Sequence, residues 1–350
     1  MTRLAPPLKA STAEHAFRAV LGELQATRAS VVFPEPLSAS ALVIAEVLTT
    51  LGVHVDVSLT PELSFQELPS VEAAAGWVPP IGDDVPELLV LYGGQPWRDP
   101  FANDYLVGIE AMKNREAHLA RGTQILFVEW PYGARKDAEI DLSPEQVAEI
   151  FDRAIAIDYD EMRRWNAELL DALEGNDEVR VTCPHGTDVT FSVEGRTFHP
   201  EDCRLGALEP DVYLPGGEVY VAIREDSANG TVAFRHVGAP RIATFKAGVL
   251  TQVRDAQGRP DLALAEELGC GFEPLCEFGV GTNTWSPPWQ IGTLYEKCSG
   301  TIHVAVGGNQ HFGGERDSPR HMDLVVRDPV VWLGMKRLRL PRADWKEASQ

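Results

Sequence analysis

The first half of the chain alternates between helical and strand-like spacing of its apolar residues. Phe17, Val20 and Leu24 recur at intervals of three and four, which predicts an amphipathic helix over residues 14–28. Further helices are expected at residues 38–51, 107–120, 143–156 and 159–174, and short apolar runs predict strands at residues 30–33, 53–57, 87–92 and 124–129. Strands that alternate with helices are typical of a parallel sheet covered on both faces. Residues 1–176 are therefore predicted to form an α/β domain.

The second half, which follows Gly175, is rich in turns and β-branched residues. Its expected strands form two hairpin patterns, at residues 178–183 with 188–193 and at residues 218–223 with 230–235. One helix is expected near residues 261–268. This pattern predicts a β-rich α+β domain over residues 177–350. The predicted fold class is thus α/β, with an N-terminal parallel-sheet α/β domain and a C-terminal β-rich domain.

The composition is that of a globular protein with a strong acidic excess. Of the 350 residues, 44% are hydrophobic and 24% are charged, which are ordinary globular values. The 52 acidic and 31 basic residues give a formal net charge of -21. Such a charge repels nucleic acid and anionic membrane surfaces. We therefore expect neither nucleic acid nor a membrane as a partner.

The cysteines and the N-terminal residues indicate a compartment. Five cysteines are an odd number, and no two of them form a CxxC pair, so neither a disulfide framework nor a thiolate zinc site is expected. The first nine residues lack the apolar core of a signal peptide, and no apolar run reaches the roughly 18 residues of a membrane span. We therefore expect a cytoplasmic protein.

The stretch over residues 296–323 contains the first candidates for chemistry. His321 and Asp323 stand two apart at the start of an apolar run, and in a strand this spacing puts both side chains on one face. His303 lies among β-branched residues, where an imidazole is costly to bury without a partner. This stretch is therefore predicted to contain metal ligands.

Two glutamates further upstream extend this candidate set. Glu218 and Glu277 each lie in an apolar or glycine-rich segment, where a metal ion or an ion pair is the usual partner of a buried charge. Three carboxylates and two imidazoles suit one or two zinc, cobalt, manganese or iron(II) ions, and two ions fit this number of donors better. Structural alternatives are that His303 is a core histidine bonded to a backbone carbonyl, and that the glutamates pair with Arg224 or Arg316.

A series of motifs follows in order along residues 178–330. They are Asp188-Val-Thr-Phe-Ser-Val-Glu-Gly-Arg196, Leu214-Pro-Gly-Gly-Glu-Val-Tyr220, Glu225-Asp-Ser-Ala-Asn-Gly-Thr231, Cys276-Glu-Phe-Gly279, His303-Val-Ala-Val-Gly307 and His321-Met-Asp323. Together they resemble the C-terminal domain of the thermophilic-aminopeptidase family of metallopeptidases. The resemblance implies a homodimer and a site for two divalent metal ions, zinc, cobalt or manganese. Its implied ligands are Glu218, Glu277, His303, His321 and Asp323.

The resemblance, together with the loop positions of some residues, suggests further roles. The family's acidic pair upstream of the first ligand histidine corresponds here to Glu296-Lys297, which makes Glu296 the candidate general base. His311 is the alternative proton carrier. Arg316 and His185 lie in glycine-flanked loops and are candidate substrate-binding residues.

The tail of these motifs, over residues 313–323, resembles a neighbouring branch, the dihydroxypyridine ring-cleaving dioxygenases. Those enzymes use one iron(II) ion held by two histidines and a carboxylate. His303, His321 and Asp323 would supply that triad here. In that branch a histidine stands at the position of Glu277 and an apolar residue at that of His303, so the ligand identities favour hydrolysis.

The sequence therefore predicts a metal-dependent hydrolase of the aminopeptidase type that acts on a peptide or another small amide. An iron(II) dioxygenase that opens a hydroxylated pyridine or aromatic ring is the alternative. A metal-free binding protein on the same fold is the third hypothesis, against which the complete ligand set argues.

Overall fold

A computed structural model of the protein describes residues 8–22, 26–34, 38–60, 78–79, 81–82, 85–93, 105–130, 142–206, 209–289, 291, 294–318 and 320–342. The chain divides into two compact units, and neither is continuous in sequence. The first comprises Met1–Arg135, Leu142–Tyr159 and Cys203–Gly216, and the second comprises Lys136–Asp141, Asp160–Asp202 and Gly217–Gln350. The chain therefore passes between the units several times.

The first unit is built on a five-stranded parallel sheet in the order β2-β1-β3-β4-β8. Its strands are β1 (Arg28–Pro34), β2 (His54–Thr60), β3 (Leu88–Tyr92), β4 (Gln124–Val128) and β8 (Asp211–Leu214). Its helices are α1 (Ala10–Leu21), α2 (Ser38–Thr50), α4 (Tyr105–Ala120) and α5 (Pro144–Ile155). The apolar strands β3 and β4 are buried along almost their whole length, as expected in the middle of a parallel sheet. The predicted N-terminal α/β fold is confirmed.

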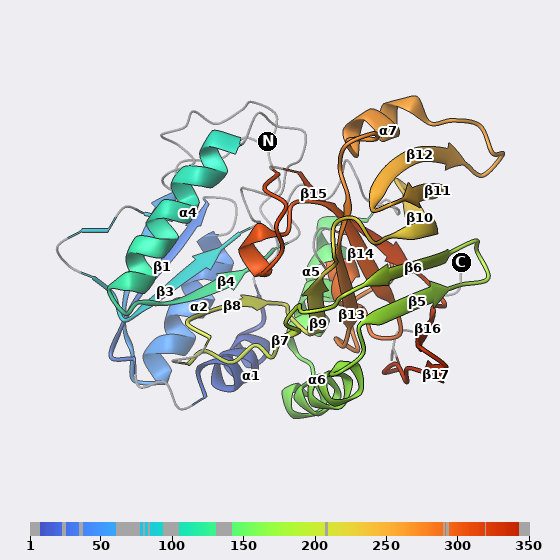
Figure 1. The fold of residues 1–350 in the computed structure, drawn as a ribbon. Coiled ribbons are helices and arrows are strands. Elements are labelled where there is room, and N and C mark those ends of the chain that lie inside the picture. Colours follow the sequence, from blue (N-terminus) through green and yellow to red (C-terminus); the bar gives the residue numbers. More distant parts are fainter. Residues whose placement is uncertain are drawn as a thin grey trace. The chain divides into compact units, whose positions relative to one another are not determined.

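The described part of the second unit contains two antiparallel sheets and the α-helices α6 (Tyr159–Leu173) and α7 (Leu262–Glu267) (Figure 1). One sheet has the order β12-β11-β10-β6-β5-β16-β17 and the other the order β15-β14-β13-β9-β7. The strands of the first are β5 (Glu178–Thr182), β6 (Asp188–Ser192), β10 (Asn229–His236), β11 (Ala239–Lys246), β12 (Val249–Asp255), β16 (Val330–Leu333) and β17 (Lys336–Arg337). Those of the second are β7 (His199–Glu201), β9 (Glu218–Ala222), β13 (Leu275–Gly281), β14 (Ile302–Gly307) and β15 (His321–Val326). The predicted β-rich C-terminal half is confirmed.

These two sheets bury their apolar faces in one common core. The core contains alternate residues of the five-stranded sheet, among them Val219, Phe278 and Val304. It also contains residues of the seven-stranded sheet, and the rings of Phe191 and Phe278 join the two with centroids 5.4 Å apart. Because side chains alternate along a strand, the polar residues between the core positions must point to the opposite face of the five-stranded sheet. That face carries the candidate site.

Three details differ from the predicted elements. The first helix begins at Ala10 and ends before Gly22, whose positive φ of 53° a glycine adopts easily. The hairpin predicted between residues 218–223 and 230–235 is wrong, because β9 pairs with β13 and β7 whereas β10 pairs with β11 and β6. The sequence predicts a single domain boundary after residue 176. In the structure, α6 precedes that boundary but groups with the second unit, and β8 follows it but adds to the sheet of the first.

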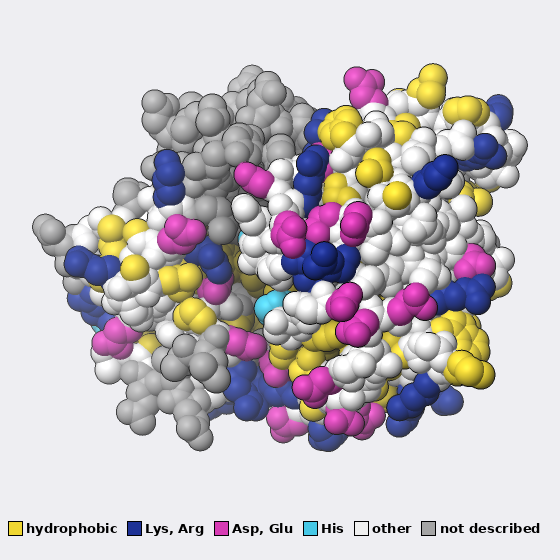
Figure 2. Space-filling model, in the orientation of Figure 1, with side chains coloured by type: hydrophobic (Ala, Val, Ile, Leu, Met, Phe, Trp, Pro, Cys, Tyr) yellow, Lys and Arg dark blue, Asp and Glu magenta, His cyan; other side chains and the backbone are white. Residues whose placement is uncertain are grey.

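The described surface shows charges of both signs. Figure 2 shows acidic and basic side chains interspersed over the face that it draws, without one continuous basic patch among the coloured residues. In the described part of the chain, no helix is both long and apolar enough to cross a membrane.

Candidate metal centre

The five predicted ligands lie on four neighbouring strands of the five-stranded sheet. Glu218 opens β9, Glu277 lies on β13, His303 on β14, and His321 and Asp323 on β15. The pairing aligns Glu277 with Ala305 and Ala305 with Asp323, so these three positions form one row across the sheet. The strand residues next to the ligands, Val219, Phe278, Val304 and Leu324, point into the common core. The five side chains therefore share the opposite face.

Small residues between the candidate ligands give the larger side chains room. Gly279 pairs with His303, and a Cβ atom added at Gly279 would lie only 2.0 Å from His303 Cε1. The imidazole of His303 thus lies directly across the backbone of β13. Only glycine at this position leaves space for that ring.

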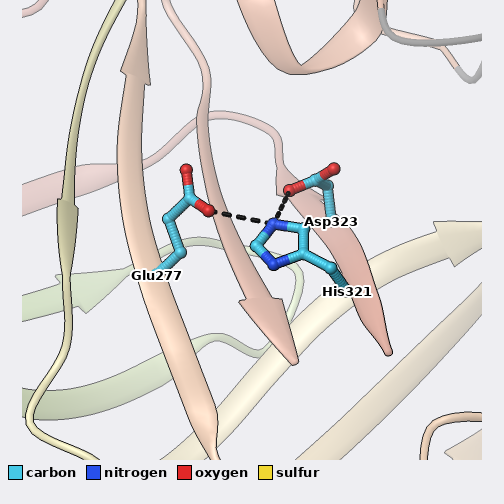
Figure 3. Close-up of side chains that lie close together, drawn as sticks. All are labelled: Glu277, His321 and Asp323. Atoms are coloured by element: carbon cyan, nitrogen blue, oxygen red, sulfur yellow. Dashed lines mark ion pairs between the residues drawn. The ribbon is translucent and has the colours of Figure 1, made fainter. Parts of the chain in front are cut away.

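Glu277, His321 and Asp323 form the tightest group, which we call the central triad. His321 Nε2 lies 2.9 Å from Glu277 Oε2 and 3.6 Å from Asp323 Oδ1. Figure 3 shows the imidazole between the two carboxylates. One potential ligand atom from each of the three residues lies within 4.8 Å of the others. Ligands around a tetrahedral ion with ~2.0 Å bonds are about 3.3 Å apart, so these separations suit one shared ion.

Both histidines are oriented through their Nδ1 atoms. His321 Nδ1 lies 2.9 Å from the carbonyl oxygen of Gly308, and His303 Nδ1 lies 3.2 Å from that of Glu296. A carbonyl can only accept, so each Nδ1 carries the proton and donates it. This leaves Nε2 of each ring directed at the carboxylates, which is the arrangement of histidines that bind a metal ion.

The carboxylates and imidazoles shift one another's pKa strongly. Burial by itself raises the pKa of Glu277, but hydrogen bonds from His303 and His321 outweigh burial and lower this pKa to about 2. Burial lowers the pKa of His303, but the carboxylates of Glu218 and Glu277 raise it to about 10. The pKa of His321 is likewise raised despite burial, chiefly by Asp323. Without a metal ion, the face therefore balances its carboxylates with protonated imidazoles.

Glu218 is bound to a residue that the sequence did not single out, Lys297. The Lys297 ammonium lies 2.5 Å from Glu218 Oε1, 2.9 Å from Glu201 Oε2 and 3.4 Å from Glu296 Oε1. Glu201 and Glu218 are direct neighbours on β7 and β9. The other oxygen of Glu218, Oε2, is buried, accepts no hydrogen bond from a described residue and lies 3.5 Å from His303 Nε2. We call Glu218 and His303 the outer pair.

The two candidate proton carriers differ in burial. Glu296 lies in the short helix η3 (Leu294–Lys297), is buried, and shares a hydrogen bond with the carboxylate of Asp323 that helps to lower the pKa of that group. His311 lies in η4 (Gln310–Phe312), is exposed, and its ring centroid is 6.0 Å from that of His321. Glu296 thus touches a member of the central triad, whereas His311 lies further out.

The described contacts of the two candidate substrate-binding residues are with residues outside the central triad. Arg316 binds the buried carboxylate of Glu273, with Nε and a terminal nitrogen each 3.0 Å from Oε2. The structural alternative in which Arg316 pairs with Glu218 or Glu277 is therefore wrong. His185 lies 3.0 Å from Asp328, which follows the far end of β15 from His321. No described contact joins either residue to the central triad.

The donor set fits a divalent metal ion. Two carboxylates and one imidazole are hard to borderline ligands, which zinc, cobalt, manganese and iron(II) accept. The buried Glu218 oxygen and the Nε2 atom of His303 offer further donors beside the central triad. A metal ion would also relieve the burial of so many charged groups.

Comparisons with known proteins identify the fold. No protein-family model and no curated protein sequence matches the chain. Its structure is similar to that of 2,5-dihydroxypyridine dioxygenase from Pseudomonas putida KT2440, with a TM-score of 0.67 and 15% identity over 98% of this chain and 100% of that one. It is also similar to wild-type AmpT from Thermus thermophilus, with a TM-score of 0.59 and 17% identity over 92% of this chain and 94% of that one. At such identities the likeness is one of fold, and both of these proteins are enzymes.

Proposed function

We propose that this protein is a metal-dependent hydrolase of the aminopeptidase type that cleaves a peptide or another small amide. The observation that carries this proposal is the central triad with Glu296 beside it. A carboxylate-rich site with a further carboxyl group at its edge suits the activation of water by a metal ion and a general base. The fold similarity to AmpT, an aminopeptidase, is consistent with it.

In this proposal the chain's own residues divide the work. Glu277, His321 and Asp323 hold the ion, and the carbonyl of Gly308 keeps the His321 ring in the tautomer that exposes Nε2. A bound ion would supply Lewis acidity for the scissile carbonyl and would lower the pKa of a water molecule toward neutral pH. Glu296 would accept a proton from the attacking water and return it to the leaving amine.

An iron(II) dioxygenase is the second candidate, favoured by the fold similarity over the whole chain to the dihydroxypyridine enzyme. That function would use His303, His321 and Asp323 as a triad of two histidines and one carboxylate. The three donors that converge most closely include Glu277 in place of His303. Because the dioxygenase branch has a histidine at the position of Glu277, the carboxylate at this position, rather than the convergence of the three donors, supports the hydrolase better.

The metal content of protein purified without chelator tests these functions together with two assays. Zinc, cobalt or manganese with release of a chromogenic amine from amino-acyl anilides is the result expected for the hydrolase. Iron with oxygen uptake on hydroxylated pyridines would refute it, and protein that binds no metal at all would favour the binding-protein hypothesis. Asp323→Asn should abolish metal binding, while Asp328→Asn, an exposed matched control, should not.

We also propose that the protein is a homodimer whose substrate is a peptide or another small molecule, as the family resemblance implies. Light scattering coupled to size-exclusion chromatography measures the dimer directly. A mass near 38.4 kDa for the eluted species would contradict it.

A further inference from the structure

Lys297 is the feature of the site that a two-metal centre does not explain. Its side chain is only 3% exposed, and three carboxylates surround its ammonium at 2.5, 2.9 and 3.4 Å. A lysine is rarely buried to this extent unless it is paired. Lys297 therefore supplies a fixed positive charge inside the group of carboxylates.

The position of this charge interferes with a second metal ion. The central triad is the group of described donors that converges on one point, so it would hold the first ion. A second ion would have to bind the outer pair, Glu218 and His303, which lies beside the triad. The ammonium already occupies Glu218 Oε1, so an ion on Oε2 would sit beside a buried positive charge. Like charges at such short range repel strongly where water does not screen them.

Lys297 also removes the electrostatic need for a second ion. Glu201 and Glu218 face each other across β7 and β9, and two adjacent carboxylates destabilise a sheet unless a cation lies between them. The ammonium bridges both. The second oxygen of Glu218 faces His303, whose Nε2 lies 3.5 Å from Glu218 Oε2 and 3.3 Å from Glu277 Oε1.

We propose that the centre binds a single divalent metal ion, in the central triad, and that the ammonium of Lys297 takes the place of a second ion beside Glu218. This proposal rests on the proposed metal-dependent function and revises the expectation of two ions. It makes Lys297 the residue that sets the number of metal ions.

Metal stoichiometry tests this proposal without reference to activity. We would measure Mn²⁺ bound per chain by elemental analysis after equilibrium dialysis, and the Mn²⁺ electron paramagnetic resonance spectrum, which distinguishes isolated ions from coupled pairs. The wild-type protein and Lys297→Arg, the control that keeps the charge, should each bind one isolated ion. Lys297→Gln should bind a second ion, and its spectrum should show coupling.

Glu218→Gln keeps the test decisive if Lys297→Gln does not fold. Because Glu218 is not a ligand in this proposal, Glu218→Gln should still bind one ion. Two ions in the wild-type protein, loss of the ion in folded Glu218→Gln, or a single ion in folded Lys297→Gln would each overturn the inference and leave the hydrolase standing. A wild-type protein that binds no ion would instead refute the proposed function itself.

Discussion

Gly279→Ala tests the way in which His303 crosses β13. The added Cβ would lie 2.0 Å from Cε1, 2.3 Å from Nε2 and 2.9 Å from Nδ1 of the His303 ring. The ring has no easy escape, because Nδ1 is bound to the Glu296 carbonyl at 3.2 Å and Nε2 faces Glu277 at 3.3 Å. Relief of the clash requires a shift of more than 1 Å and the loss of at least one of these bonds.

Overpacking of this kind costs about 1–3 kcal/mol. With a urea m-value of about 3 kcal/mol/M, the unfolding midpoint should fall by roughly 0.3–1 M. The assay is urea denaturation followed by fluorescence and circular dichroism. The chain divides into two units, so two transitions are expected, and only that of the second unit should shift.

Gly206→Ala is the matched control, since a Cβ at Gly206 meets nothing within 4 Å. It should leave the stability unchanged within about 0.5 kcal/mol. If Gly279→Ala were as stable as this control, the imidazole would not lie across β13, and the described geometry of the outer pair would be wrong.

Three further predictions concern the ligands, pH and a helix cap. His321→Ala removes a ligand, so metal affinity measured by titration calorimetry should fall by at least about 100-fold, whereas His185→Ala should not change it. Metal binding must displace the proton from Nε2 of His321, whose pKa is raised in the metal-free protein, so the affinity should rise from pH 6 to pH 8 with proton release, and a pH-independent affinity would contradict this. Asp261 caps α7 by accepting from Leu264 N, and this bond and Arg241 lower its pKa, so Asp261→Ala should lose about 1 kcal/mol of stability at pH 7. That contribution is present above the unfolded pKa and is lost as the pH falls through the lower folded pKa, so thermal unfolding of the variant and the wild type should converge in acid.

Much of the fold follows from local patterns. The helix predicted at residues 159–174 appears as Tyr159–Leu173, and the strand predicted at residues 124–129 as Gln124–Val128. Such elements are readable because side-chain periodicity is a property of neighbouring residues. The hairpin prediction for β9 and β10 failed because turn residues between two strands do not decide whether the strands pair with each other.

The sequence by itself determined which candidate side chains of one strand share a face of the sheet. His321 and Asp323 share a face because they are two residues apart in a strand, and that relation needs no tertiary contact. Only the tertiary structure decided their neighbours. Strand pairing brings Glu277 within reach of His321. The short helix η3 places Lys297 between Glu201 and Glu218, residues 79 or more positions away from it. Pairing across such distances depends on the burial of whole sheet faces, which no short stretch of sequence encodes.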